Sequence, residues 1–109
     1  MKPYEKDVYV CIDLETTGLN PTQDEIIEVG AVKFSHGKIM DSFQALVNPY
    51  RQIGQFITDL TGIAQAELDK ELGFNQISQQ LTDFIGIHPI VSQNVQFDIK
   101  FLTNKGFRI

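Results

Sequence analysis

The chain of 109 residues contains no tryptophan and one cysteine, Cys11. A single cysteine cannot form a disulfide bond within the chain, which favours a reducing, cytoplasmic location. Because Cys11 lies in an apolar run, we expect a small buried residue rather than a reactive thiol. A secretory signal and an apolar run of membrane-spanning length are also missing, so the sequence predicts no membrane partner.

Positive charge is scarce. The chain has 9 Lys and Arg against 14 Asp and Glu, a formal net charge of −5, and no two basic residues are adjacent. This argues against a protein that binds nucleic acid through a broad basic surface. A nucleic-acid ligand would have to be held by a metal site and a few local contacts, or by a larger partner or attached domain. The length suits one small domain, residues 1–109.

The most informative stretch is Val8 to Asn20, VYVCIDLETTGLN. Its first residues are apolar at both odd and even positions, which predicts a central strand covered on both faces. Asp13 and Glu15 follow at the carboxyl end of this strand, on the same side and about 7 Å apart. Two neighbouring carboxylates repel each other, and a bound Mg²⁺ or Mn²⁺ would relieve the repulsion. The alternative is that both acids are solvated turn residues.

The remaining pattern predicts an α/β fold. Strands over 25–34 and 39–47, joined by a turn, should form an antiparallel meander with the first strand. A short helical turn should begin at Thr58 and end at Gly62, and a longer helix over 73–85 should end at Gly86. After this helical crossover, a strand over 88–91 should pair in parallel with the first strand.

Two further acids have alternative interpretations. We expect Glu28 to have a structural role at a strand edge, with an approach to the acids of the first strand as the less favoured alternative. A helix over 94–102 should be capped by Asn94, with Phe97, Phe101 and Leu102 along one face. Asp98 lies in the first turn of this helix, where an acid commonly stabilises the helix dipole.

Two motifs, DLETTGLNP from Asp13 and NVQFDIKFL from Asn94, resemble the first two motifs of the DEDD superfamily of 3′–5′ exonucleases, DnaQ-like and of the polymerase III epsilon type. The short LTGI signature from Leu60 also recurs in this family, whereas Gln93 stands where the second motif usually has histidine. The resemblance implies a ribonuclease H-like mixed sheet and metal-dependent hydrolysis of single-stranded DNA or RNA from the 3′ end, releasing nucleoside monophosphates.

The resemblance also implies roles for individual residues. Asp13 would bind both of two Mg²⁺ or Mn²⁺ ions, Glu15 one of them and Asp98 the other. Thr16 would contact the terminal nucleotide through its main chain, and Leu19 would wedge between the last two bases. The last two expected substrate contacts are Thr61 and Asn94.

The third motif of the family, H-x-x-x-x-D, supplies a general-base histidine and a fourth acid. His36 and Asp41 have this spacing but flank a predicted hairpin, and His88 is followed five residues later by Gln93, so we reject all of them as catalytic. We therefore expect a domain incomplete at its carboxyl end, inactive alone and prone to self-association, from a proofreading subunit, a helicase fusion or a free exonuclease. The alternatives are a degenerate, non-catalytic domain that binds nucleic-acid ends or docks on a polymerase or helicase, and a ribonuclease H-like endonuclease.

Overall fold

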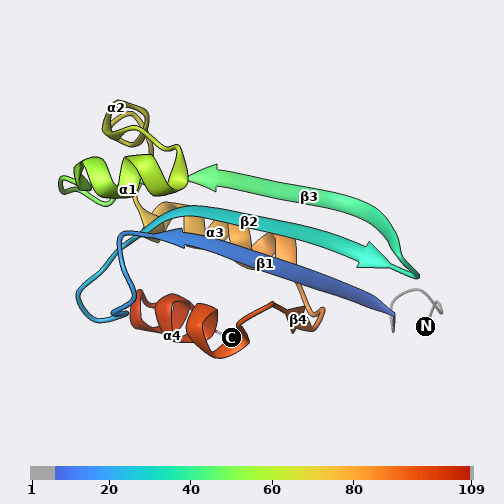
Figure 1. The fold of residues 1–109 in the computed structure, drawn as a ribbon. Coiled ribbons are helices and arrows are strands. Elements are labelled where there is room, and N and C mark those ends of the chain that lie inside the picture. Colours follow the sequence, from blue (N-terminus) through green and yellow to red (C-terminus); the bar gives the residue numbers. More distant parts are fainter. Residues whose placement is uncertain (1–6, 109) are drawn as a thin grey trace.

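The computed structural model describes residues 7–108, which form a mixed sheet with helices (Figure 1). The strands are β1 (Val8–Thr16), β2 (Ile26–Ser35), β3 (Lys38–Leu46) and β4 (Ile90–Val91). The helices are α1 (Gly54–Thr61), α2 (Gln65–Leu68), α3 (Phe74–Ile85) and α4 (Val95–Asn104). The sheet order is β3-β2-β1-β4, so β1 and β2 lie in the middle of the sheet.

Strand pairing follows the predicted topology. β1 pairs antiparallel with β2, and β2 with β3. β4 pairs in parallel with β1 through Val10–Ile90 and Cys11–Val91, after the crossover through α3. The predicted α/β fold with a mixed sheet is confirmed, although the fourth strand is shorter than the 88–91 expected.

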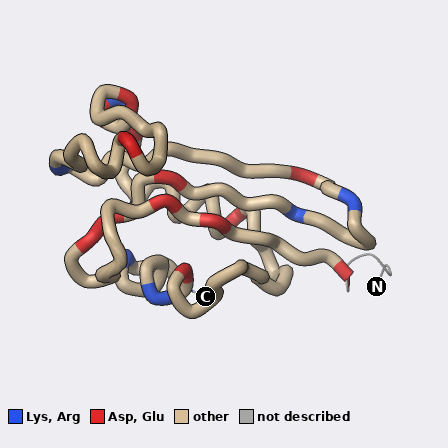
Figure 2. The backbone as a smooth tube through the Cα atoms, in the orientation of Figure 1, with Lys and Arg blue, Asp and Glu red and all other residues tan. Residues whose placement is uncertain are grey.

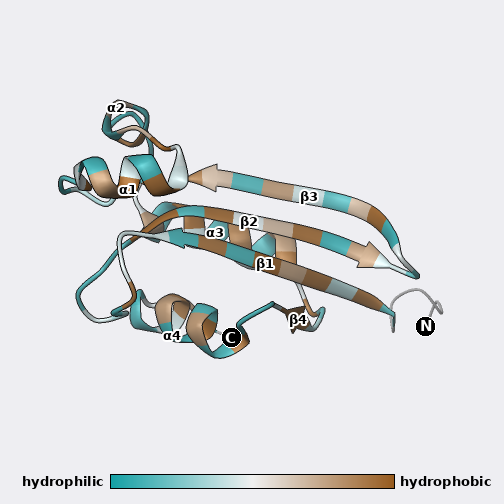
Figure 3. Ribbon diagram, in the orientation of Figure 1, coloured by the Kyte–Doolittle hydropathy of each residue, from teal (hydrophilic) through white to brown (hydrophobic). Residues whose placement is uncertain are grey.

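One face of the sheet carries the main core. Along β1 every second side chain is buried, and Figure 3 shows the hydropathy changing along the same strand. These residues share one cluster with side chains of α3 and α4; the members from the three elements include Val10, Ile12, Leu14, Ile77, Leu81, Ile85, Phe101 and Leu102. Full burial of one such side chain contributes about 1.5–3 kcal/mol to the free energy of folding. Because the cluster joins β1 to α4, it holds the end of the strand in place relative to this helix.

The opposite face of β1 is open within residues 7–108. Cys11 and Asp13 are exposed, and Tyr9 keeps 37% of its surface exposed while stacking on Phe34 at 5.9 Å between ring centroids. The expectation of a strand covered on both faces, and of a buried Cys11, was therefore wrong. The apolar residues on this face are satisfied by cross-strand pairing rather than by a covering helix.

The helix boundaries agree with the prediction at Gly62, Gly86 and Asn94, whereas α1 begins earlier than expected and α4 continues to Asn104. Gly62 and Gly86 end α1 and α3 with positive φ angles, and Asn94 caps α4 by accepting a hydrogen bond from the Phe97 amide at 3.4 Å. Thr58 does not cap α1, because the helix already begins at Gly54. The short α2 was not predicted; the Glu67 carboxylate stabilises its start by accepting from the Ala64 amide at 3.0 Å.

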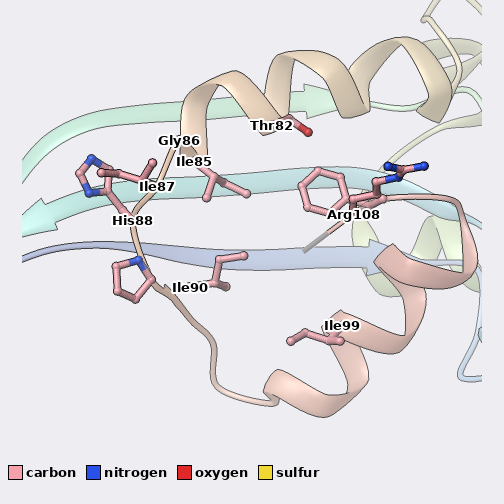
Figure 4. A pocket seen from close by; sticks show the side chains of 10 residues that line it. Thr82, Ile85, Gly86, Ile87, His88, Ile90, Ile99 and Arg108 are labelled. Atoms are coloured by element: carbon pink, nitrogen blue, oxygen red, sulfur yellow. The ribbon is translucent and has the colours of Figure 1, made fainter.

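An apolar pocket of about 360 Å³ lies between the end of α3, β4 and the segment after α4 (Figure 4). Its lining includes Ile85, His88, Ile90, Ile99 and Phe107. Among the described residues, β4 has a paired strand on the β1 side alone. Within the same range, no helix is both long enough and apolar enough to traverse a lipid bilayer.

Candidate active site

The acids of β1 lie on its open face, where they alternate with the buried Ile12 and Leu14. Asp13 is exposed, and its cross-strand neighbour is Gly30, which has no side chain to cover the carboxylate. The two residues border a hollow of about 250 Å³ on the sheet surface. The register of β1 therefore holds Asp13 out of the core and leaves open space beside it.

Glu15 is half-buried and lies directly opposite Glu28 of β2. The pKa of Glu15 is raised, first by burial and then by the negative charges of Asp13 and Glu28. The Gln44 amide donates a 2.8 Å hydrogen bond to the Glu28 carboxylate. Glu28 is thus a neighbour of the acids on an interior strand, and the preferred interpretation of a strand-edge residue was wrong.

Asp98 lies in the first turn of α4 and is 7% exposed. Its carboxylate accepts a hydrogen bond from the Ser92 hydroxyl, whose oxygen also accepts from the Asn94 amide at 3.3 Å. Burial raises the pKa of Asp98, the Ser92 hydrogen bond lowers it and the charge of Asp13 raises it again. Sequence reasoning missed Ser92. The signal available in the sequence was a serine two residues before Asn94, the expected cap of the helix that carries Asp98.

Asp13 interacts electrostatically with both other acids, since its negative charge is among the causes that raise the pKa of Glu15 and of Asp98. Figure 2 shows acidic positions along the half of the sheet where β1 ends and in the loop beyond it. Carboxylates are the donors that Mg²⁺ and Mn²⁺ prefer, so the donor set suits these ions. Within residues 7–108, however, no group of three His, Cys, Asp or Glu side chains is arranged so that it could hold a metal ion. The hydrogen bond from Ser92 engages one oxygen of the Asp98 carboxylate.

The turn after β1 presents Leu19, which is 84% exposed, as its position beside the acids predicted. Thr16 closes this turn, because its hydroxyl donates a 2.6 Å hydrogen bond to the Gly18 carbonyl. The pairing with β2 shifts register between Glu15 and Thr16, so the main chain departs from the regular ladder there. These features are compatible with a main-chain contact at Thr16 and an apolar wedge at Leu19.

The side chains of Thr61 and Asn94 already have structural partners. The Thr61 hydroxyl donates to the Ile57 carbonyl at 2.8 Å and accepts from the Ile63 amide at 3.2 Å, and so shapes the end of α1. Asn94 caps α4. Their roles as substrate contacts stay predictions.

The sequence profile of the RNase T group, described as "Exonuclease", matches residues 10–109, which is nearly the whole chain. This chain belongs to that exonuclease family. The match includes Asp13, Glu15 and Asp98, and it confirms the resemblance to DEDD-type exonucleases that the two motifs and the LTGI signature indicated.

Relatives of this exonuclease chain include PolC-type DNA polymerases III. The protein from Thermotoga petrophila is 38% identical over 99 residues, which cover 91% of this chain and 7% of the polymerase. The protein from Bacillus subtilis is 39% identical over 98 residues, covering 90% of this chain and 7% of the polymerase. The chain thus spans a small fraction of the length of these relatives.

Solved structures give the same family. The nuclease domain of 3′hExo, a DEDDh family member bound to rAMP, superposes with a TM-score of 0.80 at 27% identity, covering 96% of this chain and 60% of that one. Exonuclease X in complex with 5′-overhanging duplex DNA gives 0.72 at 27% identity, covering 85% and 52%. The ribonuclease H-like exonuclease fold predicted from the motifs is therefore confirmed.

Proposed function

We propose that this chain is the amino-terminal part of a 3′–5′ exonuclease domain that hydrolyses single-stranded DNA or RNA and releases nucleoside monophosphates. The observation that carries the proposal is the match of the exonuclease family over residues 10–109, which includes Asp13, Glu15 and Asp98. The charge of Asp13 raises the pKa of both Glu15 and Asp98, which is consistent with these acids of β1 and α4 forming one site. The PolC-type relatives support a polymerase as the partner or parent protein.

In this proposal the chain's own residues bind and orient. Asp13, Glu15 and Asp98 hold two divalent cations, Mg²⁺ or Mn²⁺, which would polarise the phosphodiester and lower the pKa of a bound water. The exposed Leu19 would wedge between the last two bases, and the main chain at Thr16 would contact the terminal nucleotide. Thr61 and Asn94 flank the nucleotide through the loops that their side chains shape. The general-base histidine and the fourth acid of this proposal would come from the family's third motif, H-x-x-x-x-D, for which residues 1–109 offer no suitable candidate.

The test begins with cation binding by the chain itself. Titration with Mn²⁺ should saturate a weak site, and Asp13→Asn should lower the affinity roughly tenfold or more, since it removes a charge but keeps the size. Because Asp13 is exposed and its charge repels Glu15 and Asp98, this variant should unfold at a temperature no lower than that of the parent. Asp83→Asn, an exposed acid on α3, is the matched control and should leave the affinity unchanged.

The second arm uses a longer chain that continues through the third motif. It should shorten single strands from the 3′ end in the presence of Mg²⁺ or Mn²⁺, and Asp13→Asn should abolish this. Cleavage that persists in the variant, or that a chelator leaves unaffected, would refute the metal-dependent mechanism.

A non-catalytic domain that binds nucleic-acid ends is the second candidate. It is favoured by one observation, that within residues 7–108 the acids do not form a ready metal cage and Asp98 is engaged with Ser92. Strand-end binding without cleavage in the longer chain would select this candidate.

A further inference from the structure

The hydroxyl of Thr17, in the turn after β1, makes every hydrogen bond that a hydroxyl can make. It accepts from the Glu25 amide at 2.9 Å and from the Arg51 guanidinium at 3.2 Å, and it donates to the Asp24 carboxylate at 3.3 Å. One donor and two acceptor positions are the full capacity of a hydroxyl group. Thr17 therefore joins both ends of the β1–β2 connection to the segment after β3.

Arg51 reaches this connection from a distant part of the chain. The same guanidinium nitrogen donates to the Gln23 carbonyl at 2.6 Å and lies 3.6 Å from the Asp24 carboxylate. Asp24 in turn accepts from the Asn20 amide at 3.0 Å. These contacts hold the chain on both sides of the exposed Leu19, whose own side chain contributes almost nothing to its position.

The network continues into α4. The Thr17 amide donates to the Glu25 carbonyl at 2.9 Å, so residues 17 and 25 are bonded twice. The Glu25 carboxylate forms an ion pair with Lys105 at 3.0 Å, and the Lys105 side chain is only 14% exposed. Lys105 immediately follows α4, the helix that carries Asp98. The turn beside Asp13 and Glu15 is thereby connected to the element that supplies the third acid.

We propose that Thr17, Asp24 and Arg51 are positioning residues that hold the Leu19 turn in the geometry needed to receive a strand end. This inference rests on the proposed function, because it assumes that the Leu19 turn contacts nucleic acid. None of the three needs to touch the reacting phosphate. Their effect is to reduce the conformational freedom that the turn would otherwise lose on binding.

The first measurement follows amide hydrogen exchange in the 109-residue chain. Thr17→Val keeps the shape of the side chain but removes the hydroxyl, and it should speed exchange of the Glu25 and Asn20 amides roughly tenfold, the scale of one lost hydrogen bond. Thr17→Ser keeps the hydroxyl and should restore the parent rates. The buried Val29 amide of β2 reports on global opening and should be unaffected.

The second measurement is the binding of a fluorescent oligothymidylate with a free 3′ end, in the presence of Mn²⁺ at low salt. Thr17→Val should weaken binding roughly fivefold to tenfold, Thr17→Ser should bind like the parent, and the Mn²⁺ affinity should not change in either. Arg51→Ala supplies a second perturbation, since the exposed Arg51 can be removed without opening the core.

The outcomes separate the two ideas. If the turn amides exchange faster in Thr17→Val and Arg51→Ala but strand binding is unchanged, the positioning role is refuted while the proposed function stands. If the turn amides exchange at the parent rate in both variants, the claim that Thr17, Asp24 and Arg51 hold the turn is refuted. If the unaltered chain fails to bind the oligonucleotide at all, the proposed function of the turn fails, and the positioning role falls with it.

Discussion

Replacing Leu19 by alanine should separate binding from stability. Leu19 is 84% exposed, so about a sixth of the side chain is buried. Since full burial of a leucine contributes about 1.5–3 kcal/mol, the variant should lose only about 0.2–0.5 kcal/mol of unfolding free energy. Loss of a stacking contact with a base costs about 1–3 kcal/mol. Affinity for a strand end should therefore fall by a factor of about 5–150.

The assay compares urea unfolding with fluorescence anisotropy of a single-stranded oligonucleotide in Mn²⁺. Leu14→Ala is the buried control, because Leu14 is 7% exposed and belongs to the core; it should cost about 2–5 kcal/mol of stability. Ile87→Ala is the exposed control, because Ile87 is 91% exposed and precedes β4. It should change neither stability nor binding.

The reasoning would be refuted by a Leu19→Ala protein that binds the oligonucleotide as tightly as the parent. It would equally be refuted if the variant lost as much stability as Leu14→Ala, because Leu19 would then be a structural residue. An equal loss of Mn²⁺ affinity would assign the side chain to the support of the acids instead.

Three further predictions follow from the acids, the Leu19 turn and the sheet edge. Burial and like charge raise the pKa of Glu15 and Asp98, so the folded chain retains protons that the unfolded chain releases. Without metal, the unfolding free energy should therefore fall as the pH rises from about 4 to 7. Urea unfolding at several pH values should show a smaller fall for Asp13→Asn. Gly18→Ala should lose about 1–3 kcal/mol in the same experiment, because its Cβ would lie 2.6 Å from the pinned Asp24 carboxyl carbon, and unchanged stability would show that Asp24 can move. The edge of β4 and the apolar pocket beside it should drive concentration-dependent self-association of the 109-residue chain, and sedimentation of a stable monomer at high concentration would contradict this.

Most strands and helix ends could be predicted because their signals are local. An apolar run that ends in two acids marked β1, Gly62 and Gly86 ended helices, and Asn94 began one. The start of α1 could not be found in this way, because Ile53 makes no side-chain cap and Gly54 is a poor helix former. Thr58 has the chemistry of a cap but lies inside the helix.

The surroundings of the acids were harder to predict than the acids themselves. Asp13, Glu15 and Asp98 were recognisable from motifs, whereas Glu28 comes opposite Glu15 only through the register of β1 and β2. Ser92 reaches Asp98 only through the turn into α4. The exposure of Cys11 depends on what covers the sheet, and the composition of a single strand does not contain that information.

The alternation of acids and core residues along β1 also protects the fold from mispairing. A slip of one residue against β2 would drive Asp13 and Glu15 inward and bring Ile12 and Leu14 out into water. Uncompensated carboxylates in an apolar interior cost several kcal/mol each, so a slip by one residue, or by any odd number of residues, is strongly disfavoured. The charges of Asp13 and Glu15, which repel each other in the native site, therefore also help to select the register of β1 against β2. Neutralising them would make pairing in a register shifted by one residue easier and would also weaken cation binding.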